Sequence, residues 1–369
     1  MADPGTDADE IAGWLRLVAT PGVGPVACRA LLAAFGLPEA IFAASRDQLA
    51  RVVPANVATA LKSARDDALT EKTIAWAAQP GNHVLTFADA RYPRSLLEIT
   101  DPPPILYAKG RVELLDPAGL AIVGSRNATP QGLIDAKRFA EALAGAGLTI
   151  VSGLALGIDG AAHEGALAAG PGGASTIAII GTGADVVYPA AHRRLAHRIA
   201  DEGLLLSEFP LGTTAQSHHF PRRNRLIAGL ARGVLVVEAA PQSGSLITAR
   251  LAAESGRDVF AIPGSIHSPL SKGCHRLIRD GAKLVESVAD ILDELRIPAP
   301  ARVQQAAATD DEAHARVLDA MGFDPVSIDA LADRLAISVT ELASSLLALE
   351  LAGRLVRLPG QRVQRVETG

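Results

Sequence analysis

A run of histidine, phenylalanine and arginine residues is the part of the sequence best suited to bind an anion. Residues 218–225 have the sequence H-H-F-P-R-R-N-R, and no acidic residue occurs between Glu208 and Glu238, although four arginines do. Guanidinium groups bind phosphates and an aromatic face stacks on a base, a combination typical of proteins that hold single-stranded nucleic acid. The run also fits the start of a helix with Phe220 in the core and arginines paired to Glu208 or Glu238. Both interpretations stay open.

Four glycine-containing turns form a second group of candidate residues. They have the sequences V-G-S-R at 123–126, S-G-L-A-L-G-I-D at 152–159, G-T-G-A-D at 181–185 and G-S at 244–245. In a parallel sheet, such turns lead from the carboxyl end of a strand into a helix N-terminus, whose free N–H groups bind anions. One turn of this kind is common, but four on one rim, with Arg126 in the first, predict an anion-binding rim.

The usual enzyme signatures are missing. The chain has no Gly-Lys dipeptide for a Walker A loop and no G-x-S-x-G turn, and Val186 stands where a dinucleotide fingerprint starting at Gly181 needs glycine or alanine. The two cysteines, Cys28 and Cys274, form no C-x-x-C pair, which excludes a disulfide scaffold and a thiolate zinc site. We therefore predict no catalytic residue, no metal and no cofactor.

One enzymatic alternative stays open at the second glycine turn. Asp159 and His163 are four residues apart and would share a helix face, so they could act as an acid–base pair. A capping aspartate and a packed histidine explain the same spacing.

The elements that must position these residues form a doubly wound α/β domain. Short apolar runs alternate with alanine-rich helical stretches, which predicts a parallel sheet covered by helices on both faces. The expected strands are 120–123, 148–151, 176–180, 204–206, 234–237 and 259–262.

Two smaller units flank this predicted domain of residues 86–297. Residues 8–78 show helical spacing and predict, for residues 1–85, a helical domain that is SAM-like or helix-hairpin-helix-like. The turn at 20–25 (T-P-G-V-G-P) also fits a plain glycine turn in a bundle. A linker is expected at 298–309. Residues 310–369 then predict a winged helix.

The winged helix is expected to contain three helices and a hairpin. The helices are Glu312–Ala320, Ser327–Leu335 and Thr340–Leu349, and the hairpin strands are 354–358 and 362–366. A stiff bridge over residues 92–110, with three consecutive prolines at 102–104, is expected to separate the first domain from the sheet and to form neither a helix nor a central strand.

Charge is distributed unevenly along the chain. The total is −5, but the three predicted domains, with the linker counted in the second, carry −2, +1 and −4 in order. An anion-binding site is therefore expected in the middle domain. The acidic start of the chain lacks the basic and apolar regions of a signal peptide, and glycines interrupt the long uncharged stretch at 165–184. We expect a cytoplasmic protein with no membrane insertion.

Several segments in collinear order resemble the DNA-processing protein A family (DprA, also called Smf). The run F-P-R-R-N-R-L-I-A-G-L at 220–230 carries most of the resemblance. The remaining matching segments are V-V-E-A at 236–239, S-G-S-L-I-T-A at 243–249, V-G-S-R at 123–126, S-G-L-A-L-G-I-D at 152–159 with His163, D-V-V-Y-P at 185–189, V-F-A-I-P-G at 259–264 and L-I-R-D-G-A at 277–282. The resemblance covers roughly residues 86 to 295.

The resemblance implies an extended Rossmann-like domain that binds single-stranded DNA without sequence preference. It also implies a homodimer that protects incoming strands and helps load the RecA recombinase in natural transformation, which makes the chain a binding protein. The alternatives are a Rossmann-like nucleotide glycosidase and a duplex binder that uses the helix-hairpin-helix and the winged helix.

The resemblance also assigns roles to individual residues. It places a phosphate on Arg126 and a stacked base on Phe220. Arg222, Arg223 and Arg225 become further backbone contacts or pocket supports, with Arg225 expected to brace the fold. The donors expected along the same rim are Ser152, Gly153, Gly244 and Ser245.

Two features depart from the family pattern. The chain reads G-C-H-R at 273–276 where many members have Gly-Thr-Asn, so contacts from that loop are not carried over. The third helix of the predicted winged helix contains Glu341, is followed directly by Glu350 and has no lysine or arginine, which does not suit a helix that faces phosphates. This domain is therefore predicted to bind protein, with any DNA contact limited to the arginines of the hairpin, which are Arg354, Arg357, Arg362 and Arg365.

Overall fold

The computed structural model describes residues 8–63, 67–116, 119–170, 174–298 and 312–366. Except for Pro298, the predicted linker lies outside the described residues.

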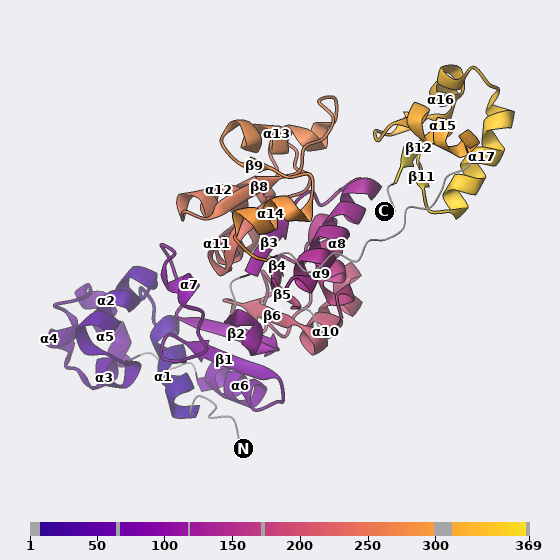
Figure 1. Ribbon diagram of the computed structural model, residues 1–369. Helices are drawn as coiled ribbons and strands as arrows, with labels where there is room; N and C mark the ends of the chain where they lie inside the picture. The colour runs from indigo at the N-terminus through magenta and orange to yellow at the C-terminus, as the bar shows by residue number, and fades with distance from the viewer. Residues whose placement is uncertain (1–7, 64–66, 117–118, 171–173, 299–311, 367–369) are drawn as a thin grey trace.

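A nine-stranded sheet forms the centre of the molecule, in the order β1-β2-β6-β5-β4-β3-β7-β8-β9 (Figure 1). The strands are β1 (Asn82–Thr86), β2 (Ile105–Gly110), β3 (Gly119–Val123), β4 (Ile150–Ser152), β5 (Thr176–Ile179), β6 (Leu204–Ser207), β7 (Ala231–Val236), β8 (Asp258–Ala261) and β9 (Lys283–Leu284). All six predicted strands are present, and the predicted doubly wound α/β fold is confirmed.

The strand order contains a reversal beside β3. The chain runs outward from β3 through β4, β5 and β6, all parallel, and then returns to place β7 on the other side of β3, also parallel. In doubly wound sheets, loops at such a reversal diverge to opposite faces and leave a crevice at the carboxyl ends of the two strands.

Successive residues of β3 pack against opposite layers of helices. Leu120 and Ile122 face a core formed with α8, α9 and α14, whereas Ala121 and Val123 face one formed with α11, α12 and α13. A further helix, α10, packs beside α9. The bounds of the seven helices are α8 (Pro130–Gly145), α9 (Ile158–Ala168), α10 (Arg193–Glu202), α11 (His219–Leu230), α12 (Ser245–Glu254), α13 (Lys272–Arg279) and α14 (Val288–Glu294). Within the described ranges, no helix combines the length and apolar composition needed to cross a membrane.

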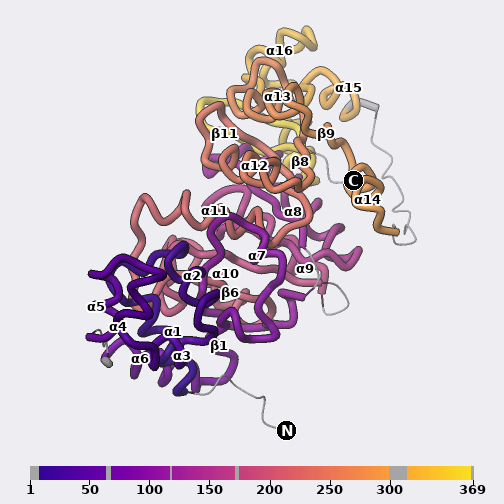
Figure 2. Tube along the Cα trace, turned by 90° about the vertical axis from the view of Figure 1, so that its left-hand side faces the viewer, coloured from indigo at the N-terminus to yellow at the C-terminus, as the bar shows by residue number. Residues whose placement is uncertain are grey.

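The N-terminal helices pack on the antiparallel edge of the sheet (Figures 1 and 2). Trp14 and Leu17 share a buried core with Ile105 and Tyr107 of β2. The helices are α1 (Ala8–Ala19), α2 (Pro25–Phe35), α3 (Pro38–Ala43), α4 (Arg46–Leu49), α5 (Ala55–Ser63) and α6 (Asp67–Ala77). The N-terminal helices and this edge of the sheet therefore share one hydrophobic core.

Two strands of this edge were not expected from the sequence. β1 and β2 pair antiparallel, and β2 follows directly after the prolines predicted to form a stiff bridge. The bridge itself contains α7 (Arg94–Leu97), and Tyr92 donates its hydroxyl hydrogen to the carbonyl oxygen of Pro103 at 2.8 Å. Proline is compatible with the approach to a strand, so the run precedes β2 without interrupting it.

The C-terminal unit has the predicted winged-helix elements. They are α15 (Glu312–Met321), α16 (Ile328–Leu335), α17 (Val339–Leu351), β11 (Leu355–Leu358) and β12 (Arg362–Arg365), with an additional short strand β10 (Val326–Ser327) that pairs with β12. Leu318, Leu331, Leu342 and Leu346 form its separate core.

Candidate nucleic-acid interface

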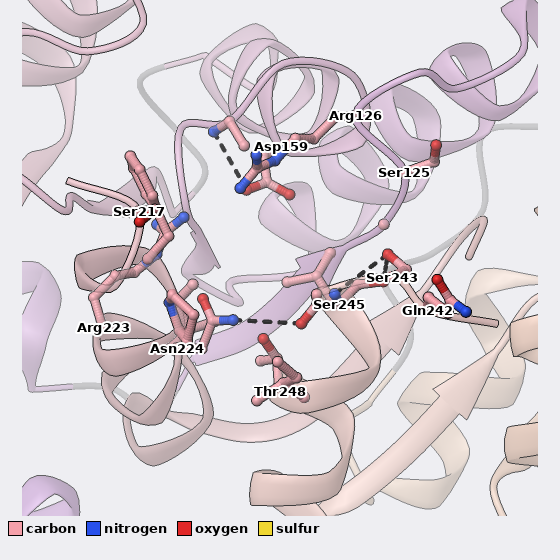
Figure 3. Close-up of a pocket in the computed structure, with 18 of the residues that line it drawn as sticks. Ser125, Arg126, Asp159, Ser217, Arg223, Asn224, Gln242, Ser243, Ser245 and Thr248 are labelled. Atoms are coloured by element: carbon pink, nitrogen blue, oxygen red, sulfur yellow. Dashed lines mark hydrogen bonds between the residues drawn. The ribbon is translucent and has the colours of Figure 1, made fainter. Parts of the chain in front are cut away.

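An open cavity of about 730 Å³ lies at the carboxyl ends of β3 and β7, where the strand order reverses (Figure 3). We call it the switch-point cavity. Its lining residues are Val123, Gly124, Ser125, Arg126, Asn127, Ala155, Asp159, Tyr188, Ala215, Gln216, Ser217, Phe220, Pro221, Arg223, Asn224, Ile227, Ala240, Gln242, Ser243, Gly244, Ser245, Ile247 and Thr248. Three of the four predicted glycine turns contribute to it.

The loop after β3 holds Arg126 at the cavity edge. Gly157, at φ +78°, lies so close to this loop that a Cβ would collide with the carbonyl oxygen of Ser125. The N–H of Ile158 donates to the same oxygen at 3.1 Å. At the far end of the loop, Thr129 donates from its N–H and its hydroxyl to the Glu238 carboxylate, at 2.9 and 2.6 Å. The Arg126 backbone is therefore fixed while its side chain stays exposed.

Phe220 stands in the first turn of α11, beside Arg126. The guanidinium carbon of Arg126 lies 5.6 Å from the centre of the Phe220 ring, and the Tyr188 ring centre lies 5.5 Å from it at a 36° tilt. A Cβ at Gly181 would sit 3.1 Å from two atoms of the Phe220 ring, so this glycine leaves just enough room for the ring. Phe220 is half-buried, and its ring is supported from the side of Gly181.

Arg223 is buried at the base of the cavity, whereas an arginine that binds a ligand at the surface would be exposed to solvent. It is 3% exposed, and its guanidinium donates to the carbonyl oxygen of Ile179 and lies against Gly153, where a Cβ would collide with it. Burial lowers the pKa of Arg223 to about 10, and the nearby Asp159 carboxylate opposes this shift. Arg223 therefore adds a buried positive charge to the cavity and packs against the backbone that forms its base.

Asp159 supplies the compensating negative charge. Burial raises the pKa of Asp159, while Arg223 and the N–H groups of Ala155 and Gly153 lower it. Arg126 lies beside it in Figure 3 and acts in the same direction. With Asp159 ionised, two guanidinium groups against one carboxylate leave the cavity with a net positive charge.

Arg222 and Arg225 lie outside the cavity lining and share one carboxylate. Arg225 binds Glu208 through two nitrogens at 2.7 and 2.8 Å, and Arg222 reaches the same group at 3.0 Å. The Glu208 side chain is only 2% exposed, so it needs these partners. Arg232, the fourth arginine of the run, donates instead to the carbonyl oxygen of Leu295.

The four predicted rim donors separate into two pairs. Gly244 and Ser245 line the cavity at the start of α12, where Ser245 donates its N–H to the Ser243 hydroxyl at 3.3 Å (Figure 3). Ser152 is fully buried and donates to the carbonyl oxygen of Ile122 at 2.6 Å. Gly153 is buried against Arg223, so Ser152 and Gly153 support the cavity from below.

His163 does not reach the cavity. Its Nε2 accepts the N–H of Leu154 at 3.2 Å, and its Nδ1 lies 2.7 Å from the Thr176 hydroxyl, which itself donates to Ile150. Burial lowers the pKa of His163 to about 3, so the ring is neutral with both nitrogens engaged. This arrangement matches the packed histidine and gives no support to an acid–base pair with Asp159.

Several cavity residues were not singled out from the sequence. Tyr188 occurs in a segment used for the family resemblance, and Asn224 occurs inside the arginine run, where its amide donates to the carbonyl oxygen of Gly244 at 3.4 Å. Thr248 also occurs in a segment used for the family resemblance, whereas Asn127 and Gln242 carry no local pattern. The segment 273–276, which departs from the family pattern, lies in α13 and not in a loop; Cys274 is buried there, and His275 bonds to Gly264 outside the cavity. Among the described residues, no group of three or more potential ligands could hold a metal ion.

Two family models match the chain. Residues 83–296 match DNA recombination-mediator protein A, and residues 299–361 match the DprA winged helix domain. Protein Smf of Escherichia coli is 42% identical over 303 residues, which is 80% of each chain. DNA processing protein DprA of Streptococcus pneumoniae is 52% identical over 206 residues, which cover 56% of this chain and 72% of that protein.

Two solved structures are similar as well. DNA processing protein A from Streptococcus pneumoniae aligns with a TM-score of 0.67 at 41% identity, over 79% of this chain and 98% of that chain. DNA processing protein A from Helicobacter pylori aligns with a TM-score of 0.52 at 32% identity, over 58% of this chain and 95% of that chain. The latter structure concerns the single-stranded DNA binding mode of that protein.

Proposed function

The chain belongs to the DprA/Smf family of DNA recombination-mediator proteins, and on that premise we propose that it binds single-stranded DNA in the switch-point cavity. Phe220 stacks on a base and Arg126 binds the adjoining phosphate. Gly244 and Ser245 add donors on the opposite rim. Arg223 balances Asp159 below the bound strand, and Arg222 and Arg225 hold the start of α11 to Glu208.

The observation that carries this proposal is the pairing of Phe220 with Arg126 on an open cavity. Asp159 is the only acidic residue among the described lining residues, whereas hydroxyl and amide side chains are numerous. Phosphate oxygens accept hydrogen bonds and carry charge, so this lining suits a polynucleotide backbone. Stacking on Phe220 tolerates any base, since every base has a π face.

The cavity favours a single strand for a geometric reason. Both faces of a base are covered by its neighbours inside a duplex, and a base must leave the stack to lie against Phe220. A single strand has no base pairs to break, so its bases reach the ring at a lower cost in free energy.

The direct test compares a fluorescent oligothymidine with a duplex of equal length at 50 and 200 mM salt. We expect the single strand to bind more tightly, with log K falling by about 0.7 per log unit of salt for each phosphate neutralised. Equal affinity for the duplex would favour a duplex binder, and affinity independent of salt would contradict the phosphate contacts.

The wider role follows from family membership. We propose that the chain acts as a homodimer that protects incoming single strands and passes them to the RecA recombinase in natural transformation, and that it does so without catalysis. We also propose that the domains of the chain end at residues 85 and 297 and that the linker ends at residue 309.

The winged helix has a surface that suits protein better than DNA. Val339, Leu347 and Leu351 are exposed on α17, the helix expected to enter a groove, and this helix has no lysine or arginine. In the hairpin, Arg357 is paired with Glu350 at 2.8 Å. An apolar helix face lacks the charge that phosphate contacts need. We propose that this domain binds a protein partner.

Deleting residues 310–369 is expected to leave the affinity for single-stranded DNA nearly unchanged, because every residue lining the switch-point cavity precedes the deletion. Titration of the shortened chain with the same oligothymidine measures this. A tenfold or greater loss of affinity would contradict the proposal and give the winged helix a direct part in DNA binding.

A further inference from the structure

A second cavity adjoins the switch-point cavity on the other side of Arg126. It has a volume of about 410 Å³, and Arg126 and Asn127 line both cavities. We call it the α8–α9 cavity, because most of its lining belongs to those helices. Its lining residues are Arg126, Asn127, Ala128, Leu133, Ile134, Lys137, Gly157, Gly160, Ala161, Glu164 and His192.

Close packing of α8 on α9 places Lys137 at this cavity. A Cβ at Gly165 of α9 would collide with the backbone of Lys137, so the two helices approach closely at this point. The Lys137 side chain is exposed, and it forms no ion pair with any residue that the structure describes. Its ammonium group is therefore available to an external anion.

His192 borders the cavity from a short 3₁₀ helix (Ala190–His192) directly before α10. A Cβ at Gly160 would lie 2.6 Å from Cε1 of His192, so the ring rests directly on the first turn of α9. Nδ1 lies 3.0 Å from the carbonyl oxygen of Leu154, which requires a hydrogen on Nδ1. Within the described chain, Nε2 has no hydrogen-bond partner.

The charges of the cavity favour an anion. Two cations, Arg126 and Lys137, face one carboxylate, Glu164, and these side chains are exposed. The Nε2 atom of the partly exposed His192 donates to an anion when the ring is protonated. Leu133 is 36% exposed and provides an apolar wall beside them. A nucleotide combines an anionic phosphate with apolar sugar and base faces, and this lining can contact both.

We propose that the DNA strand bound at Phe220 continues past Arg126 into the α8–α9 cavity, where Lys137 and the protonated ring of His192 bind a further phosphate. This inference rests on the proposed function, since it extends the path of the same strand. Arg126 is the shared element, because its guanidinium lies 5.6 Å from the Phe220 ring on one side and its residue lines the second cavity on the other. The ligand is a phosphodiester of the bound strand.

The test uses Lys137→Ala, His192→Gln and Glu164→Gln in the full chain, titrated with the fluorescent oligothymidine at several salt concentrations. Loss of one phosphate contact should weaken binding about eightfold at 50 mM salt and about threefold at 200 mM, and should lower the salt slope by about 0.7. We expect this for Lys137→Ala and a smaller loss for His192→Gln. Glu164→Gln should bind more tightly, which misfolding cannot imitate.

The control is Arg29→Ala, which removes an exposed cation on α2, and it should change neither the affinity nor the slope. If Lys137→Ala and Glu164→Gln bind like the wild type while Phe220→Ala binds weakly, the strand does not enter this cavity and the inference is wrong. Lack of single-strand binding by the wild type would refute the proposed function together with the inference. Inorganic phosphate that protects Lys137 from chemical modification, without any effect of Lys137→Ala on DNA, would show a free-phosphate site instead.

Discussion

Replacing Phe220 with alanine is expected to weaken the binding of single-stranded DNA by about 5- to 150-fold. Stacking of a base on an aromatic side chain contributes about 1–3 kcal/mol, which corresponds to that range of affinity. The ring is already supported in the free protein by Gly181 and Tyr188, so little ordering is needed when a base arrives. Because stacking is not ionic, the salt slope should stay at the wild-type value.

Arg126→Ala distinguishes the contribution of the guanidinium charge from that of the Phe220 ring in the same experiment. It should weaken binding about eightfold at 50 mM salt and lower the slope by about 0.7. Phe323→Ala provides a matched control, since Phe323 is a solvent-accessible phenylalanine that also has a guanidinium near its ring, 4.6 Å from the ring centre, but belongs to the winged helix. If Phe220→Ala binds as tightly as the wild type, or if Phe323→Ala is equally weakened, the switch-point cavity is not the stacking site.

The sequence predicts the central sheet well because its strands carry a local pattern. The predicted strands are short runs of mostly apolar residues, largely buried between the two helix layers, and helical stretches separate them along the chain. β1 and β2 lack such a pattern. β2 begins directly after the proline run and lies inside the segment predicted to be a stiff bridge, and its partner β1 lies before that segment. Their strand character depends on the helices that cover them, which a local pattern does not contain.

The sequence predicts where the site lies, but it does not predict which arginines face solvent and which support the fold. Strand ends and glycine turns locate the rim, and the order of motifs identifies Arg126 and Phe220. Whether a neighbouring arginine faces solvent depends on carboxylates brought in from elsewhere in the chain. Glu208 lies 17 residues before Arg225, and Asp159 lies 64 residues before Arg223, on a different crossover helix. The expectation that Arg225 braces the fold agrees with its contacts, whereas the burial of Arg223 has no local signature.

The burial of Arg223 leads to the largest expected effect on stability. Arg223→Met is expected to lower the free energy of unfolding of the central domain by about 3–5 kcal/mol, because removing one member of a buried charge pair leaves the other uncompensated. The uncompensated group is Asp159, which burial already disfavours in its charged form. Thermal and urea unfolding of the variant beside the wild type measure the loss. Arg222→Ala serves as the control, since the Arg222 side chain is 52% exposed and its loss should cost less than about 1 kcal/mol.

Loss of the Arg223 charge also makes the stability of the folded chain depend on pH. Without Arg223, the pKa of Asp159 in the folded state rises further above that of the unfolded chain, because a charge that lowered it is gone. Between those two pKa values, the folded state binds the proton that the unfolded state has released, so stability falls as pH rises. The deficit of Arg223→Met should therefore be smaller near pH 5 than near pH 8, and adding Asp159→Asn should restore much of the loss and remove the pH dependence. A double variant no more stable than Arg223→Met would mean that Arg223 supports the fold through its contacts with Ile179 and Gly153, and that its charge has no part in the effect.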